Sequence, residues 1–149
     1  MKKTCLRPIL LVEDSPADAE MAMDALREAN LANPVVHVED GVECMDWLYA
    51  RGRFADRAED DPVVVLLDIK MPRMNGLEVL TRMREDEKMR RIPVVILSSS
   101  REESDLARSW DLGVNAYVIK PVDVAQFFAA VRTLGQFWAL LNQAPETDG

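Results

Sequence analysis

Short, continuous runs of apolar residues alternate along this chain with longer segments in which apolar residues recur at helical spacing. The apolar runs occupy residues 9–12, 35–38, 63–67, 94–97 and 116–119, and the helical patterns occupy residues 16–29, 42–50, 77–87, 102–112 and 124–141. Strands that are apolar on both faces are typical of a parallel sheet with helices on both sides. The pattern therefore predicts an α/β fold, (βα)5, with a doubly wound parallel five-stranded sheet.

The ends of the predicted elements carry recognisable signals. Ser15 can cap the first helix, Pro16 fits its first turn, and Asp18 places negative charge near the positive end of the helix dipole. Gly113 suits the left-handed end of the fourth helix. The charged connector at residues 51–61 is long for this architecture, and we expect it to be a mobile loop.

Length and charge limit the possible functions. A chain of 149 residues with 48% hydrophobic content predicts one domain, which we place at residues 1–143, followed by a disordered tail at residues 144–149. The net charge of −8 opposes binding to nucleic acid and to anionic membrane surfaces, and no apolar stretch is long enough to span a bilayer. Cys5 and Cys44 lack metal-site or CxxC spacing, which favours reduced thiols and a cytoplasmic location.

Four of the strands end in residues with metal or phosphate chemistry. Glu13 and Asp14 follow the first strand, Asp68 the third, Ser98 the fourth and Lys120 the fifth. Parallel sheets bind ligands at the carboxyl ends of their strands, and a flavodoxin-like strand order of 2-1-3-4-5 would bring the three carboxylates together. Crowded carboxylates repel one another, so the pattern predicts a hard divalent cation, Mg²⁺, among them.

The same residues suggest phosphoryl chemistry. Asp68 could attack phosphorus to give an acyl phosphate, while Lys120 and Ser98 could stabilise the phosphoryl oxygens. Each residue alone is more often a loop charge, a helix cap or a surface lysine. Their coincidence at one edge of one sheet favours the functional interpretation.

Four stretches resemble the signature of response regulator receiver domains: ILLVED at residues 9–14, LLDIKMPRMNG at 66–76, IPVVILS at 92–98 and AYVIKP at 116–121. The resemblance spans nearly the whole chain. It implies a stand-alone response regulator of a two-component phosphorelay, a cytoplasmic phosphoprotein that a sensor histidine kinase phosphorylates. Such a receiver is a signalling protein with Mg²⁺-dependent self-phosphorylation and autodephosphorylation, and is not otherwise an enzyme.

The resemblance also assigns roles by position. Asp14 and Asp68 would ligate Mg²⁺, Glu13 would assist through water, and the backbone carbonyl of Lys70 would complete the protein ligands. Asp68 would be the phosphoacceptor.

Further roles concern the phosphoryl group and the switch. Lys120 would pair with that group, aimed by a cis bond to Pro121, and Ser98 would swing toward it. Tyr117 then resembles the switch aromatic that remodels the face of helix four, strand five and helix five. A half-buried structural tyrosine is an equally good interpretation of Tyr117.

Two weaker features concern partners. The long connector and Phe137-Trp138 resemble regulators that partner phytochrome-type sensor kinases. Phe137 and Leu140 project away from the apolar stripe of the last helix, which suggests a homodimer or kinase-docking contact through that helix. Trp47 and Trp110 are expected in the core or half-buried, and His37 is expected to be structural.

Other functions remain as alternatives. A pseudo-receiver would keep the fold as an interaction module without phosphorylation, although every key position is filled. An aspartate-nucleophile phosphatase would resemble a DxD pattern, whereas Lys70 stands two residues after Asp68. A flavodoxin-type cofactor binder would need a hydroxyl-rich loop in place of Glu13 and Asp14.

Overall fold

The computed structural model describes residues 6–99, 108, 110–120, 123–126 and 129. Its centre is a five-stranded sheet in the order β2-β1-β3-β4-β5, and every neighbouring pair of strands is parallel. The strands are β1 (Ile9–Val12), β2 (Val35–Val38), β3 (Val64–Asp68), β4 (Val94–Ser98) and β5 (Ala116–Ile119). The predicted fold class and strand order are confirmed, with strand ends shifted by at most one residue.

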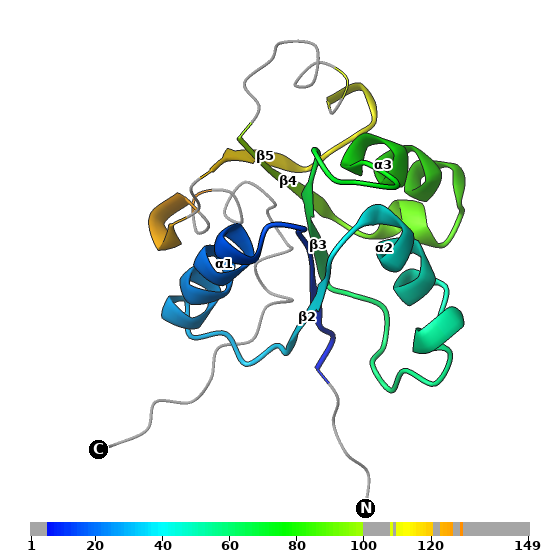
Figure 1. The fold of residues 1–149 in the computed structure, drawn as a ribbon, viewed down its shortest axis with the longest axis horizontal. Coiled ribbons are helices and arrows are strands. Elements are labelled where there is room, and N and C mark those ends of the chain that lie inside the picture. The colour runs from blue at the N-terminus through cyan, green and yellow to red at the C-terminus, as the bar shows by residue number, and fades with distance from the viewer. Residues whose placement is uncertain (1–5, 100–107, 109, 121–122, 127–128, 130–149) are drawn as a thin grey trace, which may run out of the picture.

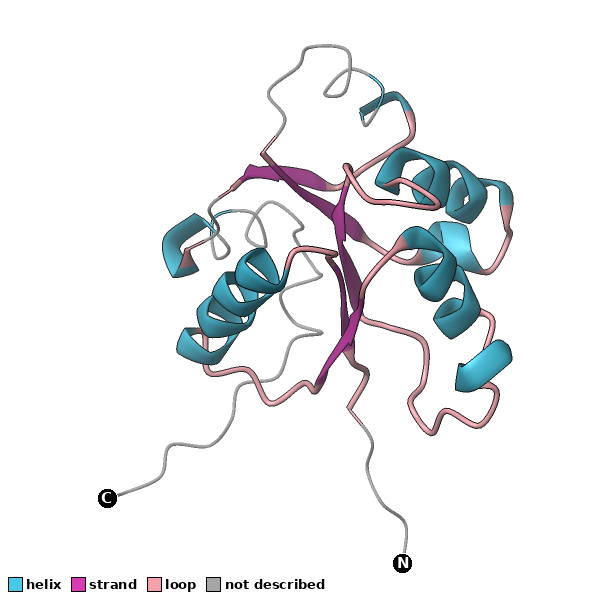
Figure 2. Cartoon of the chain, in the orientation of Figure 1, coloured by secondary structure: helices cyan, strands magenta, loops and turns pink. Residues whose placement is uncertain are grey.

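Helices cover both faces of this sheet (Figures 1 and 2). The α-helices are α1 (Pro16–Glu28), α2 (Gly41–Leu48) and α3 (Gly76–Glu85), and two 3-10 turns are η1 (Gly52–Phe54) and η2 (Met89–Arg91). Most of the fourth and fifth predicted helices lies outside the described residues. So do the Lys120–Pro121 bond, Phe137, Leu140 and the tail at residues 144–149.

The two faces of the sheet carry separate cores because strand side chains alternate in direction. Ile9 and Leu11 point into a cluster with the buried alanines of α1. Leu10 and Val12 point into the opposite cluster, with buried residues of α2 and α3. Figure 1 shows α1 on one side of the sheet and α2 and α3 on the other. The doubly wound arrangement therefore fixes β1 from both sides.

Helix starts lie close to the carboxyl ends of the strands. The Ser15 side chain accepts a hydrogen bond from the backbone amide of Asp18 at 3.3 Å, so the predicted cap of α1 is confirmed. The α3 helix begins with a capping box in which Asn75 and Glu78 satisfy each other's backbone amides.

Two glycines let these helix starts press against the loop after β3. A Cβ at Gly76 would lie 2.1 Å from the backbone oxygen of Asp68, and a Cβ at Gly41 would lie 2.2 Å from the backbone oxygen of Met74. Neither position has room for a side chain. The loop between β3 and α3 is thus held between two helix starts.

The connector at residues 51–61 is more structured than the expected mobile loop. It contains η1, and Arg57 within it donates hydrogen bonds to the backbone oxygens of Leu48, at 3.3 Å, and Asp60, at 3.1 Å. The Arg57 guanidinium also lies 4.1 Å from the centre of the Trp47 ring. A charged residue that turns inward to bind backbone carbonyls leaves no periodic signal in the sequence.

The two described tryptophans differ in burial. Trp47 is 1% exposed, as predicted, whereas Trp110 is 53% exposed, so its expected burial was wrong. Helical spacing does not show how far the flank of a helix stands from the sheet. In the part of the chain that the structure describes, no helix is both long and apolar enough to cross a membrane.

Candidate functional site

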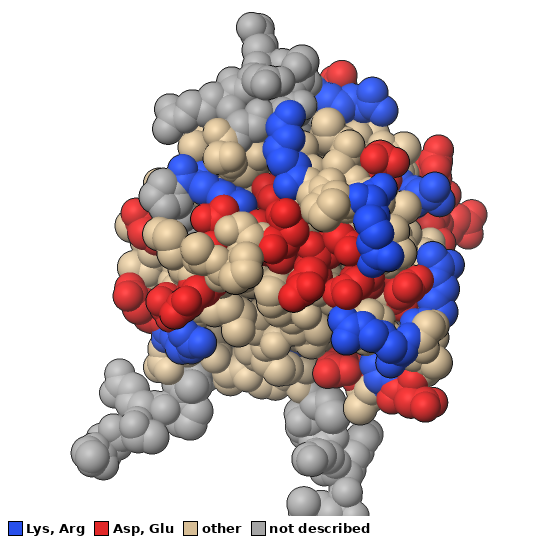
Figure 3. All heavy atoms as spheres, in the orientation of Figure 1, with Lys and Arg blue, Asp and Glu red and all other residues tan. Residues whose placement is uncertain are grey.

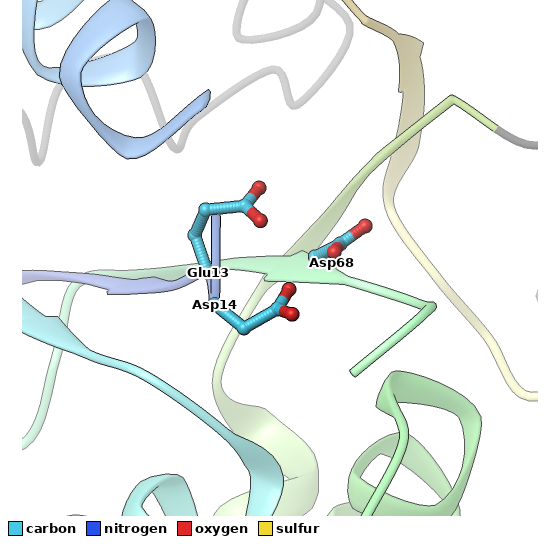
Figure 4. A group of neighbouring side chains, drawn as sticks. All are labelled: Glu13, Asp14 and Asp68. Atoms are coloured by element: carbon cyan, nitrogen blue, oxygen red, sulfur yellow. The ribbon is translucent and has the colours of Figure 1, made fainter. Parts of the chain in front are cut away.

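Three carboxylates meet where β1 and β3 end side by side. Val12 pairs with Leu67, so Glu13 and Asp14 follow β1 at the level of Asp68, the last residue of β3. One carboxylate oxygen from each of the three residues lies within 4.8 Å of the others. Figure 4 shows the three side chains around a common space. The predicted meeting of these carboxylates is confirmed.

The acidic cluster is largely withdrawn from water. Glu13 is 2% exposed and Asp68 is 4% exposed, whereas Asp14 stands at the surface. Acidic side chains also gather over the middle of the molecular face that contains the site, with basic side chains around them (Figure 3). The site is therefore an acidic cluster with two buried carboxylates and one exposed carboxylate.

Lys120 reaches into this cluster from the end of β5. Its side chain is 10% exposed, and its Nζ forms ion pairs with Glu13 Oε1, with Asp18 Oδ2 at 3.0 Å and with Asp68 Oδ1 at 3.5 Å. The predicted approach of Lys120 to Asp68 is present, but it is the longest of the three contacts. Asp18 is the site residue that sequence reasoning missed, although its place one turn into the helix after Asp14 was a usable signal.

Burial and charge change the ionisation of the site. Burial, with the nearby charge of Glu13, raises the pKa of Asp68 to about 7, although Lys120 acts against this rise. Burial alone would lower the pKa of Lys120, but hydrogen bonds to Glu13 and Asp18 and the charge of Asp68 raise it overall. The Lys120 ammonium thus forms ion pairs with three carboxylates, so its one positive charge does not balance their negative charges.

This arrangement fits a hard divalent cation. Ions such as Mg²⁺ prefer carboxylate oxygens and retain water ligands, and the open side at Asp14 leaves room for water. Burial first, and the neighbouring charges of Glu13 and Asp14 after it, raise the pKa of Asp68, and a bound cation would oppose this rise. Glu13, Asp14 and Asp68 are the residues that would hold the ion.

Further contacts fix Glu13 in place. Its Oε2 accepts a hydrogen bond from the backbone amide of Ser15 at 3.1 Å. His37 Nε2 on β2 is 2.8 Å from the backbone oxygen of Glu13, and the Glu13 amide donates to the backbone oxygen of Val38. His37 therefore ties the edge strand to the site, which agrees with the structural role expected for it.

The loop after β3 carries Lys70, whose side chain is exposed two residues beyond Asp68. Arg73 in the same loop adopts a positive φ of 66° and donates to both carboxylate oxygens of Asp40, at 2.9 and 3.0 Å. Asp40 also caps α2 by accepting from the Glu43 amide at 2.8 Å. This bidentate pair braces the loop against the start of α2.

The remaining predicted residues lie on β4 and β5. Ser98 ends β4 and is fully buried, and it pairs with Ile119 of β5, next to Lys120. Tyr117 is half-buried and packs against the core cluster on the side of α2 and α3. Both interpretations of Tyr117 therefore remain compatible with its position.

Comparison with known proteins gives one family. Residues 9–132 match the family model described as the response regulator receiver domain. The response regulator Rcp1 of Synechocystis sp. is 33% identical over 130 residues, which are 87% of this chain and 87% of Rcp1.

Two solved bacteriophytochrome response regulators are more similar in sequence. RtBRR is 52% identical with a TM-score of 0.85, covering 94% of this chain and 84% of that one. AtBRR is 54% identical with a TM-score of 0.84, covering 94% and 100%. A structure of Rcp1 is described as an Mn²⁺-bound form, with 32% identity, a TM-score of 0.74 and coverage of 89% and 94%.

Proposed function

Because this chain belongs to the response regulator receiver domain family, we propose that it accepts a phosphoryl group on Asp68 from a sensor histidine kinase, with Mg²⁺ held by Glu13, Asp14 and Asp68. The observation that carries this proposal is the buried acidic cluster with Lys120 beside it. The backbone carbonyl of Lys70, in the loop that Arg73 braces, would supply a further metal ligand.

The proposed reaction moves one phosphoryl group between two side chains. A carboxylate oxygen of Asp68 attacks the phosphorus of a phosphohistidine, a P–O bond forms, and the P–N bond breaks. The imidazole leaves with the electron pair and takes up a proton. Hydrolysis of the acyl phosphate by water returns the Asp68 carboxylate and inorganic phosphate.

The surrounding residues stabilise charge on the transferred group. A Mg²⁺ ion held by the three carboxylates would supply positive charge for the phosphoryl oxygens. Lys120 contacts Asp68 at 3.5 Å, which supports the proposal that its ammonium pairs with these oxygens. Ser98, buried at the end of the neighbouring strand, donates its hydroxyl hydrogen to the same group.

Phosphorylation then changes the surface near β5. We propose that Ser98 moves toward the phosphoryl group and that Tyr117 follows into the freed space. Tyr117 lies two residues from the pairing partner of Ser98 and lines a surface cavity of about 540 Å³ together with Trp110 and Gln126. Among the described residues, this cavity is lined by β5 and by Trp110, Gln126 and Ala129, which lie in the segments predicted as helices four and five.

The partner proposals rest on the relatives. The chain is 52–54% identical to two bacteriophytochrome response regulators. We therefore propose that its phosphodonor is a cytoplasmic phytochrome-type kinase and that this chain accepts the phosphoryl group as a stand-alone regulator. Homodimerisation through helix five belongs to the same proposal. Sedimentation as a monomer both with and without phosphorylation would remove the dimer.

The phosphorylation test is intact-mass spectrometry after incubation with acetyl phosphate and Mg²⁺. We expect one phosphoryl adduct on the wild type and on Asp56→Asn, whose exposed carboxylate lies in the connector. We expect no adduct on Asp68→Asn or in the presence of EDTA. Absence of the adduct on the wild type, or its survival in Asp68→Asn, would support the pseudo-receiver alternative.

A further inference from the structure

Lys120 has a carboxylate partner that lies outside the proposed metal site. Among the described residues, Lys120 has three carboxylate partners: Glu13 and Asp68 belong to the acidic cluster at the ends of β1 and β3, whereas Asp18 belongs to α1. The contact with Asp18 is 0.5 Å shorter than the contact with Asp68, at 3.0 Å against 3.5 Å. The ammonium therefore lies nearest to Glu13, and it contacts Asp18 of α1 more closely than Asp68.

We propose that Asp18 is a positioning residue that shares the Lys120 ammonium and so weakens the hold of that ammonium on Glu13 and Asp68, two carboxylates of the proposed metal site. The metal site itself rests on the function proposed above. The contact between Asp18 and Lys120 does not depend on it.

The local structure gives Asp18 a defined approach to the lysine. Its backbone amide is bound by Ser15, and Pro16 begins the helix, so the first turn of α1 is fixed. The Asp18 side chain is 39% exposed, while that of Lys120 is 10% exposed. Asp18 therefore spans from the surface to a buried ammonium and joins α1 to the end of β5.

The reason for such a partner is competition for oxygen atoms. An ammonium and a divalent cation both bind the lone pairs of Glu13 and Asp68, so each contact of Lys120 with these residues opposes metal binding. With Asp18 removed, every ion pair that the structure gives Lys120 would be to a metal-site carboxylate. The lysine would then compete more strongly with the metal.

The first test is calorimetric titration of the full chain with Mg²⁺ in the absence of a phosphodonor. Asp18→Asn should weaken Mg²⁺ binding about threefold to fivefold, the upper part of the range expected for a partly exposed charge pair. Asp18→Glu should restore much of the affinity. The matched control is Asp24→Asn, because Asp24 is an exposed aspartate of α1 that pairs with Arg27. This control should leave the affinity within about twofold of the wild type.

A double-mutant cycle separates competition from a general charge effect. In a Lys120→Met background, Asp18→Asn should no longer weaken Mg²⁺ binding, because the competing ammonium is absent. If Asp18→Asn weakens binding equally in both backgrounds, Asp18 acts only through its charge, and the proposal fails.

A metal-free spectrum tests the contact itself. In protein with ¹³C-labelled lysine and EDTA, the Cε signal of Lys120, assigned by its loss in Lys120→Met, should shift in Asp18→Asn and not in Asp24→Asn. An unshifted signal overturns the proposal. If the wild type binds no Mg²⁺ while the Lys120 signal shifts, the proposed function fails and the role of Asp18 as the partner of Lys120 stands.

Discussion

Lys120 and Arg57 are both cations whose side chains are 10% exposed, yet their surroundings differ in kind. Lys120 contacts carboxylates from three separate places in the fold. Arg57 contacts backbone carbonyls of its own connector and of α2, the ring of Trp47 and the carboxylate of Asp61. The carboxylates around Lys120 could bind a metal ion in its place, whereas the backbone carbonyls and the Trp47 ring around Arg57 are parts of the folded structure.

The two side chains suit these different settings. A lysine ammonium is a compact charge on a flexible stem, so it can move among several oxygens. A guanidinium is a rigid planar fork that binds several carbonyls at once and stacks on an aromatic ring. The Nε of Arg57 is buried without a hydrogen-bond partner among the described residues, so its burial carries a cost that the other contacts must offset. We infer that Lys120 serves the reaction and Arg57 serves the fold.

The largest expected effect is that of Lys120→Met. Removing the ammonium leaves the buried carboxylates of Glu13 and Asp68 without a cation, and should lower the free energy of unfolding in EDTA by about 4 kcal/mol. Mg²⁺ should restore most of this loss, because it replaces the missing charge. Urea denaturation in EDTA and in Mg²⁺ measures both values. Equal losses in the two buffers would mean that Lys120 is as structural as Arg57.

A second prediction concerns pH in the metal-free protein. The pKa of Asp68 rises from 3.8 to about 7 on folding, so between these values the folded protein binds a proton that the unfolded chain does not. This contribution to stability is complete below pH 3.8 and is lost as pH rises through about 7. At about 1.4 kcal/mol for each pH unit between these two values, it should amount to about 4 kcal/mol.

The pH effect is isolated by comparing stability curves of the wild type and Asp68→Asn in EDTA. The difference between the two curves should change over that pH range and be flat above it. Parallel curves would show that burial does not disfavour the ionised Asp68.

Arg57→Lys should have a smaller effect, which does not depend on metal. A lysine keeps the charge but cannot bind several carbonyls and stack on Trp47 together, so we expect a loss of about 2 kcal/mol in the free energy of unfolding. The control is Arg53→Lys in the same connector, whose side chain is 67% exposed. If Mg²⁺ reversed the loss of unfolding free energy in Arg57→Lys, Arg57 would respond to metal as Lys120 is expected to, and the contrast between the two cations would be wrong.

The smallest effect on stability is expected from Lys70→Ala, since its side chain is exposed beside the site. The free energy of unfolding should change by less than about 0.5 kcal/mol. The lifetime of the phosphoryl adduct should nevertheless change, because a cation at the mouth of the site affects the hydrolytic water. A mass-spectrometric time course after removal of acetyl phosphate measures this lifetime. An unchanged lifetime would show that the side chain points away.

The sequence predicted those parts of the molecule that depend on local periodicity. Apolar runs gave the strands, and the residues directly after them gave Glu13, Asp14 and Asp68, because parallel strands place their ends on one edge. The ion pair between Asp18 and Lys120 joins residues 102 positions apart and depends on how α1 is turned against the sheet. The exposure of Trp110 and the inward turn of Arg57 likewise depend on packing that no repeat in the sequence records.

The glycine contacts at the starts of α2 and α3 determine where this molecule can be redesigned. At Gly41 and Gly76 even a methyl group would meet backbone atoms of the loop that follows Asp68. An engineer who wishes to redirect the regulator to a new kinase should therefore leave that side unchanged. Substitutions should instead be made at exposed positions of α1, such as Met21, where a new side chain would face solvent.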